Sequence, residues 1–93
     1  MRQNGYEIVE RNFHSKFGEI DIIAKKAQIL HFVEVKATKT SLNSIYRITP
    51  AKMDKIIKTI NFYFLSKNSS ADYQIDAICI NNDSVEFFEN ISI

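Results

Sequence analysis

The sequence predicts an α/β fold in which a mixed β-sheet of about five strands carries a helix between its third and fourth strands. Three segments with the alternation of strands come first, one segment with helical periodicity follows, and two further strand-like segments come last. The strand segments are Tyr6 to Phe13, Gly18 to Ala24, Ile29 to Thr38, Tyr73 to Ile80 and Val85 to Phe88. Because a helix separates the third strand from the fourth, we expect these two strands to lie parallel.

The helix is predicted to begin at Thr49 and Pro50, because threonine is a favoured N-cap and proline suits the first helical position. An apolar stripe follows at spacings of three and four residues, which predicts one face packed on the sheet. Its members are Met53, Ile56, Ile57, Ile60, Tyr63 and Phe64. The polar run Asn68-Ser69-Ser70 is expected to end the helix.

The segment GEIDIIAKKAQILHFVEVK predicts a hairpin that carries charges where a sheet usually carries aliphatic residues. Residues two apart in a strand share a face, so Glu34 and Lys36 lie on the same face of the third strand. With Lys25 to Gln28 as the turn, Glu19 and Asp21 of the neighbouring strand project from that face too.

This turn also fixes the register, with Ala24 opposite Ile29 and Glu19 opposite Glu34. A turn one residue longer or shorter would send the acids to opposite faces of the sheet, so the register is a testable part of the prediction. We expect the other face of the third strand, which carries His31, to lie under the helix.

Length and composition predict one globular domain over residues 1–93. With 45% hydrophobic and 25% charged residues, the chain can form one hydrophobic core and is too apolar for a disordered protein. No apolar run approaches the roughly 20 residues of a membrane span, and the N-terminus lacks the apolar region of a signal peptide, so we expect a cytoplasmic protein without membrane contact. The single cysteine, Cys79, excludes an internal disulfide.

The start of the chain resembles the end of a helix, because Asn4-Gly5 is typical of the left-handed residue that follows a helical C-cap. Only four residues precede Gly5, and a helix of that length is not stable alone. We therefore expect an N-terminal helix to be largely missing, which would leave the domain incomplete at its N-terminus.

Charge is segregated along the chain, although the formal net charge is only +1. The stretch between Lys36 and Lys58 is basic and holds Lys36, Lys39, Arg47, Lys52, Lys55 and Lys58 against Asp54. From residue 72 onward all charges are acidic, namely Asp72, Asp76, Asp83, Glu86 and Glu89. One face could therefore meet phosphate groups, while a polycation that coats nucleic acid is excluded.

The acids on one face of the hairpin, Asp21 and Glu34, are expected to repel each other, which raises a pKa or calls for a cation between them. Oxygen ligands without a neighbouring cysteine suit Mg²⁺ or Mn²⁺, whose remaining positions are filled by water and substrate phosphate. Lys36, one pleat from Glu34, could hold a phosphate or the attacking water. The alternative is a solvated strand face on which Glu34 and Lys36 form an ordinary ion pair.

The segments GYEIVERNF, FGEIDIIA, HFVEVKA and TPAKMDKI, in this order, resemble the YraN family of small bacterial proteins. That family is similar to archaeal Holliday-junction resolvases and to the PD-(D/E)XK nucleases, which share the restriction-endonuclease-like fold. Asp21 resembles the motif aspartate and Glu34-Val35-Lys36 the E-x-K triplet, although Ile20 stands where the superfamily's name has proline. The resemblance implies a single PD-(D/E)XK nuclease-like domain over residues 1–93, preceded in family members by an N-terminal helix.

The resemblance also implies metal-dependent hydrolysis of phosphodiester bonds, with branched DNA as a candidate substrate. Asp21 and Glu34, with the main-chain carbonyl of Val35, would hold Mg²⁺ or Mn²⁺. Lys36 would orient the attacking water or stabilise the transition state. Glu19 would lie next to the metal ligands without binding the ion itself. Basic residues are expected to contact phosphates of nucleic acid without reading sequence, namely Lys16, Lys39, Arg47, Lys52 and Lys55.

Two other function classes stay open. A non-catalytic module that binds nucleic acid or protein would keep the fold without the metal chemistry, and DNA binding that ignores Mg²⁺ would support it. A two-fold homodimer scaffold would instead show self-association without DNA binding. The presence of Asp21, Glu34 and Lys36 together favours the enzyme, because a binding module has no evident need for clustered acids that face phosphate.

Several other polar and aromatic residues are interpreted as structural. Asp76 lies in a strand and is expected to find a lysine or a backbone donor, since a buried carboxylate is costly without one. Cys79 is expected in the core. No paired aromatic pattern marks a base-stacking surface, so packing roles are assigned to Phe62, Phe64, Phe87 and Phe88.

Overall fold

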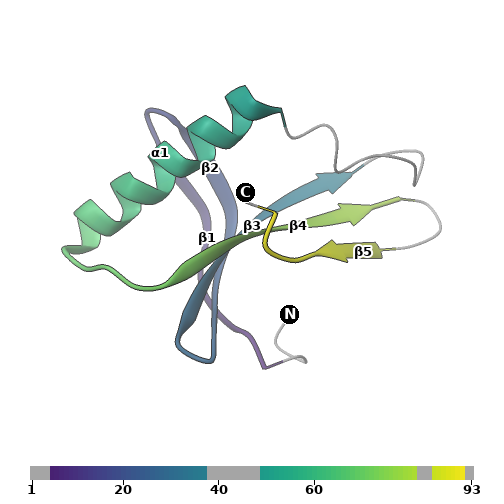
Figure 1. Cartoon of the computed structure of the whole chain (residues 1–93), viewed down its shortest axis with the longest axis horizontal. Coiled ribbons are helices and arrows are strands. Elements are labelled where there is room, and N and C mark those ends of the chain that lie inside the picture. Colours follow the sequence, from purple (N-terminus) through teal and green to yellow (C-terminus); the bar gives the residue numbers. More distant parts are fainter. Residues whose placement is uncertain (1–4, 38–48, 82–84, 92–93) are drawn as a thin grey trace.

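The computed structural model has a mixed five-stranded sheet with a helix between the third and fourth strands, which confirms the predicted fold class (Figure 1). It describes residues 5–37, 49–81 and 85–91. Within them the elements are β1 (Glu7–Ser15), β2 (Gly18–Lys26), β3 (Ile29–Ala37), α1 (Pro50–Lys67), β4 (Tyr73–Ile80) and β5 (Val85–Phe88). The strands keep their chain order in the sheet. β3 and β4 pair in parallel, as expected, and the other neighbours pair antiparallel.

Some expectations fall outside the described residues. The remnant of an N-terminal helix was expected at residues 1–4, and the description begins at Gly5, whose φ is +85°. Lys39 and Arg47, expected to contact phosphate, belong to the stretch 38–48, which is likewise outside. These expectations stay predictions.

α1 begins and ends where its sequence indicates. Oγ1 of Thr49, the N-cap, accepts the backbone N–H of Lys52 at 3.2 Å, and Pro50 follows in the first turn. Asn68 ends the helix in a left-handed conformation with a φ of 50°. The residues that α1 buries toward the sheet are Ile56, Thr59, Ile60 and Tyr63. In the part of the chain that the structure describes, no helix has the length and apolarity needed to cross a membrane.

α1 lies across one face of the sheet, over β1 and β2 (Figure 1). Phe32 of β3 packs edge-on against Tyr63 of α1, with 5.6 Å between the ring centroids. Side chains alternate along a strand, so Glu34 shares this helix-covered face with Phe32. His31 was expected here, and that prediction is wrong: its ring lies on the opposite face, 2.7 Å from Asp76 of β4.

Asp76 explains why His31 can be buried on that opposite face. Its carboxylate is fully buried and accepts hydrogen bonds from Nε2 of Gln74 and from the backbone N–H of Asn90, both at 2.8 Å. Nδ1 of His31 completes the set at 2.7 Å. Of the two alternatives predicted, a lysine or a backbone donor, the backbone donor is present, and the contact with His31 was not predicted. Cys79 is buried, as predicted.

The turn between β2 and β3 is shorter than predicted. β2 continues to Lys26, and the turn consists of Ala27 and Gln28 instead of the four residues expected from Lys25 onward. Both turn residues have positive φ, 52° and 69°. Two successive left-handed residues form the kind of turn whose twist matches that of the flanking strands, which favours this tight connection.

The shorter turn moves the register by two residues. Ala24 pairs with His31 and not with Ile29, so the predicted pairing is wrong. Because side chains alternate with a period of two, an offset of two residues keeps Asp21 and Glu34 on the same side of the hairpin. Continued in the same register, Asp21 falls level with Glu34, so the predicted grouping of the two acids survives the error.

Candidate functional site

The site begins where backbone pairing between β2 and β3 ends, after the pair Ile22 and Val33. Beyond that pair the side chain of Asp21 replaces the backbone: its Oδ2 accepts the N–H of Val35 at 2.8 Å. The N–H and C=O of one strand residue point toward the same neighbouring strand. The carbonyl of Val35 therefore faces the same side as the Asp21 carboxylate.

Glu34 brings a second carboxyl group to this place and is only 8% exposed. Burial, a hydrogen bond with Asp21 and the negative charge of Asp21 raise the pKa of Glu34 to about 7. The charge of Glu19 contributes to this upward shift of the pKa, and the ammonium of Lys52 opposes it. Near neutral pH the carboxyl group of Glu34, hydrogen-bonded to Asp21, is therefore partly protonated.

Lys52 reaches the acid pair from the first turn of α1. Its Nζ lies 3.9 Å from Oε1 of Glu34, a distance that fits an ion pair without a close hydrogen bond. The sequence predicts the position of Lys52 in the helix, but not which strand end that turn faces. This contact was therefore missed, although Lys52 had been assigned to phosphate binding.

Lys36 and Glu19 flank the acid pair in different ways. Lys36 is partly buried and shares the face of Glu34 by the alternation of β3. Glu19 does not pair with β3, contrary to expectation; it lies opposite His14 of β1, and its Oε2 is 3.2 Å from Nδ1 of that residue. Its charge still reaches Glu34, so it remains a neighbour of the acids.

Of the remaining predicted phosphate contacts, Lys16 lies at the tip of the β1–β2 hairpin, which we define as residues 15–18, and Lys55 lies on α1 beside this tip. Lys16 is exposed there, with its Nζ 5.3 Å from the ring centroid of Phe17. The tip lies against α1, because a side-chain carbon added to Gly18 would be 4.0 Å from Cβ of Lys55. Lys55 is exposed beside it, so basic side chains continue from the acid pair toward the hairpin tip.

The donor atoms of the site are all oxygens, which is the ligand type that Mg²⁺ and Mn²⁺ prefer. Asp21, Glu34 and the carbonyl of Val35 provide them from neighbouring positions. Within residues 5–37, 49–81 and 85–91, there is no group of three or more His, Cys, Asp or Glu side chains that could hold a metal ion.

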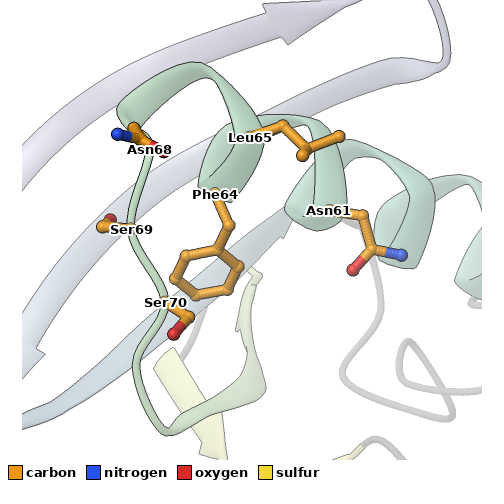
Figure 2. Close-up of a pocket in the computed structure, with 6 residues that line it drawn as sticks. All are labelled: Asn61, Phe64, Leu65, Asn68, Ser69 and Ser70. Carbon is orange, nitrogen blue, oxygen red and sulfur yellow. The ribbon is translucent and has the colours of Figure 1, made fainter.

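A pocket of about 490 Å³ lies elsewhere, at the C-terminal end of α1 (Figure 2). Figure 2 shows the Phe64 ring beside Ser70, while the side chain of Leu65 points away from that ring. The lining residues are Asn61, Phe64, Leu65, Asn68, Ser69 and Ser70. None of them carries a charge, so this pocket offers no carboxylate, histidine or lysine for acid–base chemistry, and the acid site is the better candidate for chemistry.

Comparison with known proteins identifies relatives along the whole chain. The model of the Uncharacterised protein family UPF0102 matches residues 1–80. A UPF0102 protein of Campylobacter hominis is 57% identical over 93 residues, which are 100% of this chain and 83% of the relative. A UPF0102 protein of Campylobacter fetus is 60% identical over 88 residues, which are 95% of this chain and 79% of the relative. A UPF0102 protein of Campylobacter jejuni is 56% identical over 92 residues, which are 99% of this chain and 82% of the relative. These matches confirm the family resemblance carried by the motifs, and their names state no activity.

Proposed function

The chain belongs to the uncharacterised protein family UPF0102, and we propose that it is a metal-dependent nuclease that hydrolyses phosphodiester bonds in DNA in the cytoplasm. The observation that carries this proposal is the pair of Asp21 and Glu34, hydrogen-bonded on the helix-covered face beside the main chain of Val35. Gathering two carboxyl groups in a partly buried place destabilises a fold unless a proton or a cation compensates their charge. A catalytic role explains this arrangement better than packing does.

The residues of the site divide the proposed reaction between them. Asp21, Glu34 and the carbonyl of Val35 would hold the ion. When bound, Mg²⁺ or Mn²⁺ supplies a Lewis acid that lowers the pKa of a bound water and neutralises charge on the phosphate. Lys36 presents its ammonium on the face of Glu34, where it is suited to hold a phosphate oxygen or to orient the attacking water. Glu19 adds negative charge nearby, which favours a cation.

Basic residues beside the acid pair support nucleic acid as the substrate. Lys52 and Lys55 lie on the first turns of α1, and Lys16 lies at the hairpin tip that packs on this helix. Lysines at such positions contact phosphates as point charges and do not read sequence. Branched DNA is the first substrate to test, because the family resemblance points to junction-cleaving enzymes.

Titration of Mn²⁺ followed by calorimetry tests the metal site directly. The measurement is made at pH 8, because the pKa of Glu34 is about 7 and its carboxylate must be ionised to bind a cation. We expect a single equivalent to bind to the wild type and to the control Glu7→Gln, whose glutamate is exposed at the start of β1. Binding should disappear in Glu34→Gln. Equal binding in all three proteins would exclude the metal site.

Cleavage is tested next, with a labelled four-way DNA junction and Mn²⁺. Lys36→Met removes the ammonium but none of the proposed oxygen ligands. This variant should bind Mn²⁺ as the wild type does and lose cleavage. If Lys36→Met cuts DNA at the wild-type rate, Lys36 has no part in the reaction. If the wild type binds Mn²⁺ but cuts no branched, single-stranded or duplex DNA, the nuclease proposal fails.

One observation favours a second candidate, a non-catalytic module that binds nucleic acid or protein. Lys52 already places a cation 3.9 Å from Glu34 and so compensates part of the charge that a metal would compensate. A module of this kind should bind DNA in a salt-dependent way that Mg²⁺ does not change. Self-association in the absence of DNA binding would instead support a homodimer scaffold.

A further inference from the structure

An apolar groove lies between the hairpin tip and the outer side of α1. Its volume is about 280 Å³. The lining residues are Phe17, Lys58, Asn61, Phe62 and Leu65. Phe17, Phe62 and Leu65 are 36%, 39% and 80% exposed. The ring of Phe62 contacts the ring of Phe13, but it remains partly exposed to solvent. The packing role predicted for Phe62 is therefore only partly fulfilled. An exposed apolar patch of this kind typically marks a binding surface.

Phe17 occupies a position where turn geometry gives no reason for an aromatic residue. The hairpin turn consists of Lys16 and Phe17, and turns of this length favour glycine, asparagine and aspartate. The turn is nevertheless held firmly. Oγ of Ser15 accepts the N–H of Phe17 at 3.0 Å, and the same hydroxyl lies 3.2 Å from Oγ1 of Thr59 on α1. The backbone that carries the Phe17 ring is thus held beside α1 at the groove.

Positive charge surrounds the groove. Nζ of Lys16 lies 5.3 Å from the Phe17 ring centroid, and Lys58 is part of the lining. Lys58 is partly compensated by Asp54, whose Oδ2 is 3.1 Å away, whereas Lys55 lies against the hairpin tip. An aromatic floor with lysines along its rim is what a nucleic-acid strand requires, because each base has an apolar face and each phosphate a negative charge.

We propose that this groove binds an unpaired base of a nucleic-acid strand whose backbone continues along α1 to the acid pair. The lysines that connect the two places are Lys52, Lys55 and Lys58. They are spaced by three residues, and a rise of about 1.5 Å per residue puts Lys58 about 9 Å along the helix axis from Lys52. The path along the strand rests on the proposed function, but the base site in the groove does not.

This proposal defines the substrate class. A base inside a duplex is stacked and paired, so its face cannot lie on Phe17 unless it leaves the stack. The groove would therefore favour single-stranded DNA and the unpaired positions of branched DNA over duplex.

The experiment measures binding of a fluorescently labelled oligothymidylate by anisotropy in the presence of EDTA, so that neither metal nor cleavage contributes. Phe17→Ala should weaken binding about fivefold or more, the lower end of what one stacked base contributes. Phe17→Tyr should bind as the wild type does, because it keeps the ring. The matched control is Phe87→Ala: Phe87 is 39% exposed, close to the 36% of Phe17, but it stacks on Tyr6 on the opposite face of the sheet.

Two comparisons make the result specific. A duplex of the same length should bind Phe17→Ala and wild type equally, because its bases are not available to the ring. An oligonucleotide of abasic positions should bind the wild type about as weakly as oligothymidylate binds Phe17→Ala.

The proposal is overturned if Phe17→Ala binds oligothymidylate like the wild type, or if the loss is the same for the duplex. It is also overturned if sedimentation shows a wild-type dimer that Phe17→Ala dissociates, since a second copy would then occupy the groove. Mn²⁺ titration of Phe17→Ala separates this failure from that of the nuclease proposal. The acid pair should bind the ion in this variant whether or not the groove binds a base.

Discussion

Replacing Glu34 by glutamine should stabilise the folded protein at alkaline pH, even though it removes a residue of the proposed site. Glu34 is almost fully buried and lies beside Asp21, and both factors raise the pKa of its carboxyl group. In the unfolded chain that pKa returns to its ordinary value. Ionisation of Glu34 therefore favours the unfolded state, and glutamine cannot ionise.

The size and sign of the effect follow from the two pKa values. The pKa of Glu34 rises from 4.5 to about 7 on folding, which corresponds to about 3 kcal/mol at 1.36 kcal/mol per pH unit. Between these pH values the folded state holds a proton that the unfolded state has lost. The free energy of unfolding contributed by Glu34 is thus highest below pH 4.5 and is lost as the pH rises through about 7.

Urea unfolding at pH 5 and pH 8, followed by circular dichroism without divalent ions, measures this effect. Between the two pH values the wild type should lose more stability than Glu34→Gln by about 2 to 3 kcal/mol. Glu7→Gln, which alters an exposed glutamate of β1, should behave as the wild type. Lys52→Met should steepen the loss, because the Lys52 ammonium lowers the pKa of Glu34. Equal pH dependence in wild type and Glu34→Gln would refute the reasoning.

Two further predictions concern the stability of the fold. Thr49→Ala removes the side-chain acceptor of the Lys52 N–H and should lower the free energy of unfolding by about 1 kcal/mol; an unchanged urea midpoint would argue against the cap. Asp76→Ala leaves the buried donors of His31, Gln74 and the Asn90 backbone without their acceptor. It should cost about 3 kcal/mol or more in the same assay, and a loss below about 1 kcal/mol would show that water replaces the carboxylate.

The fold class was predictable because each element carries a local signal. Thr49 and Pro50 mark the start of α1, and alternation marks the strands, so their order leads to the mixed sheet. The length of the β2–β3 turn was not predictable in the same way. Turns with two left-handed residues are usually recognised by Asn-Gly or Asp-Gly, whereas here Ala27 and Gln28 adopt that conformation. The predicted register of β2 against β3 was therefore wrong by two residues.

The acid site was partly predictable, since the grouping of Asp21 with Glu34 depends only on strand alternation. The position of α1 was not, because both faces of β3 carry apolar residues. His31 lies on the face away from α1 because Asp76, which is distant in sequence, provides its hydrogen bond there. Contacts of this kind depend on tertiary structure, as does the approach of Lys52 to Glu34.

The parallel pairing of β3 with β4 has a consequence for how the chain folds. β1, β2 and β3 can pair through short turns, but β4 pairs with β3 across a long stretch of sequence that contains α1. Until this pairing forms, one edge of β3 stays open and offers its unpaired backbone N–H and C=O groups, in a strand that is rich in apolar residues. Such non-local pairing forms slowly, so partly folded chains can associate through this edge. Refolding yield should therefore fall as the protein concentration rises.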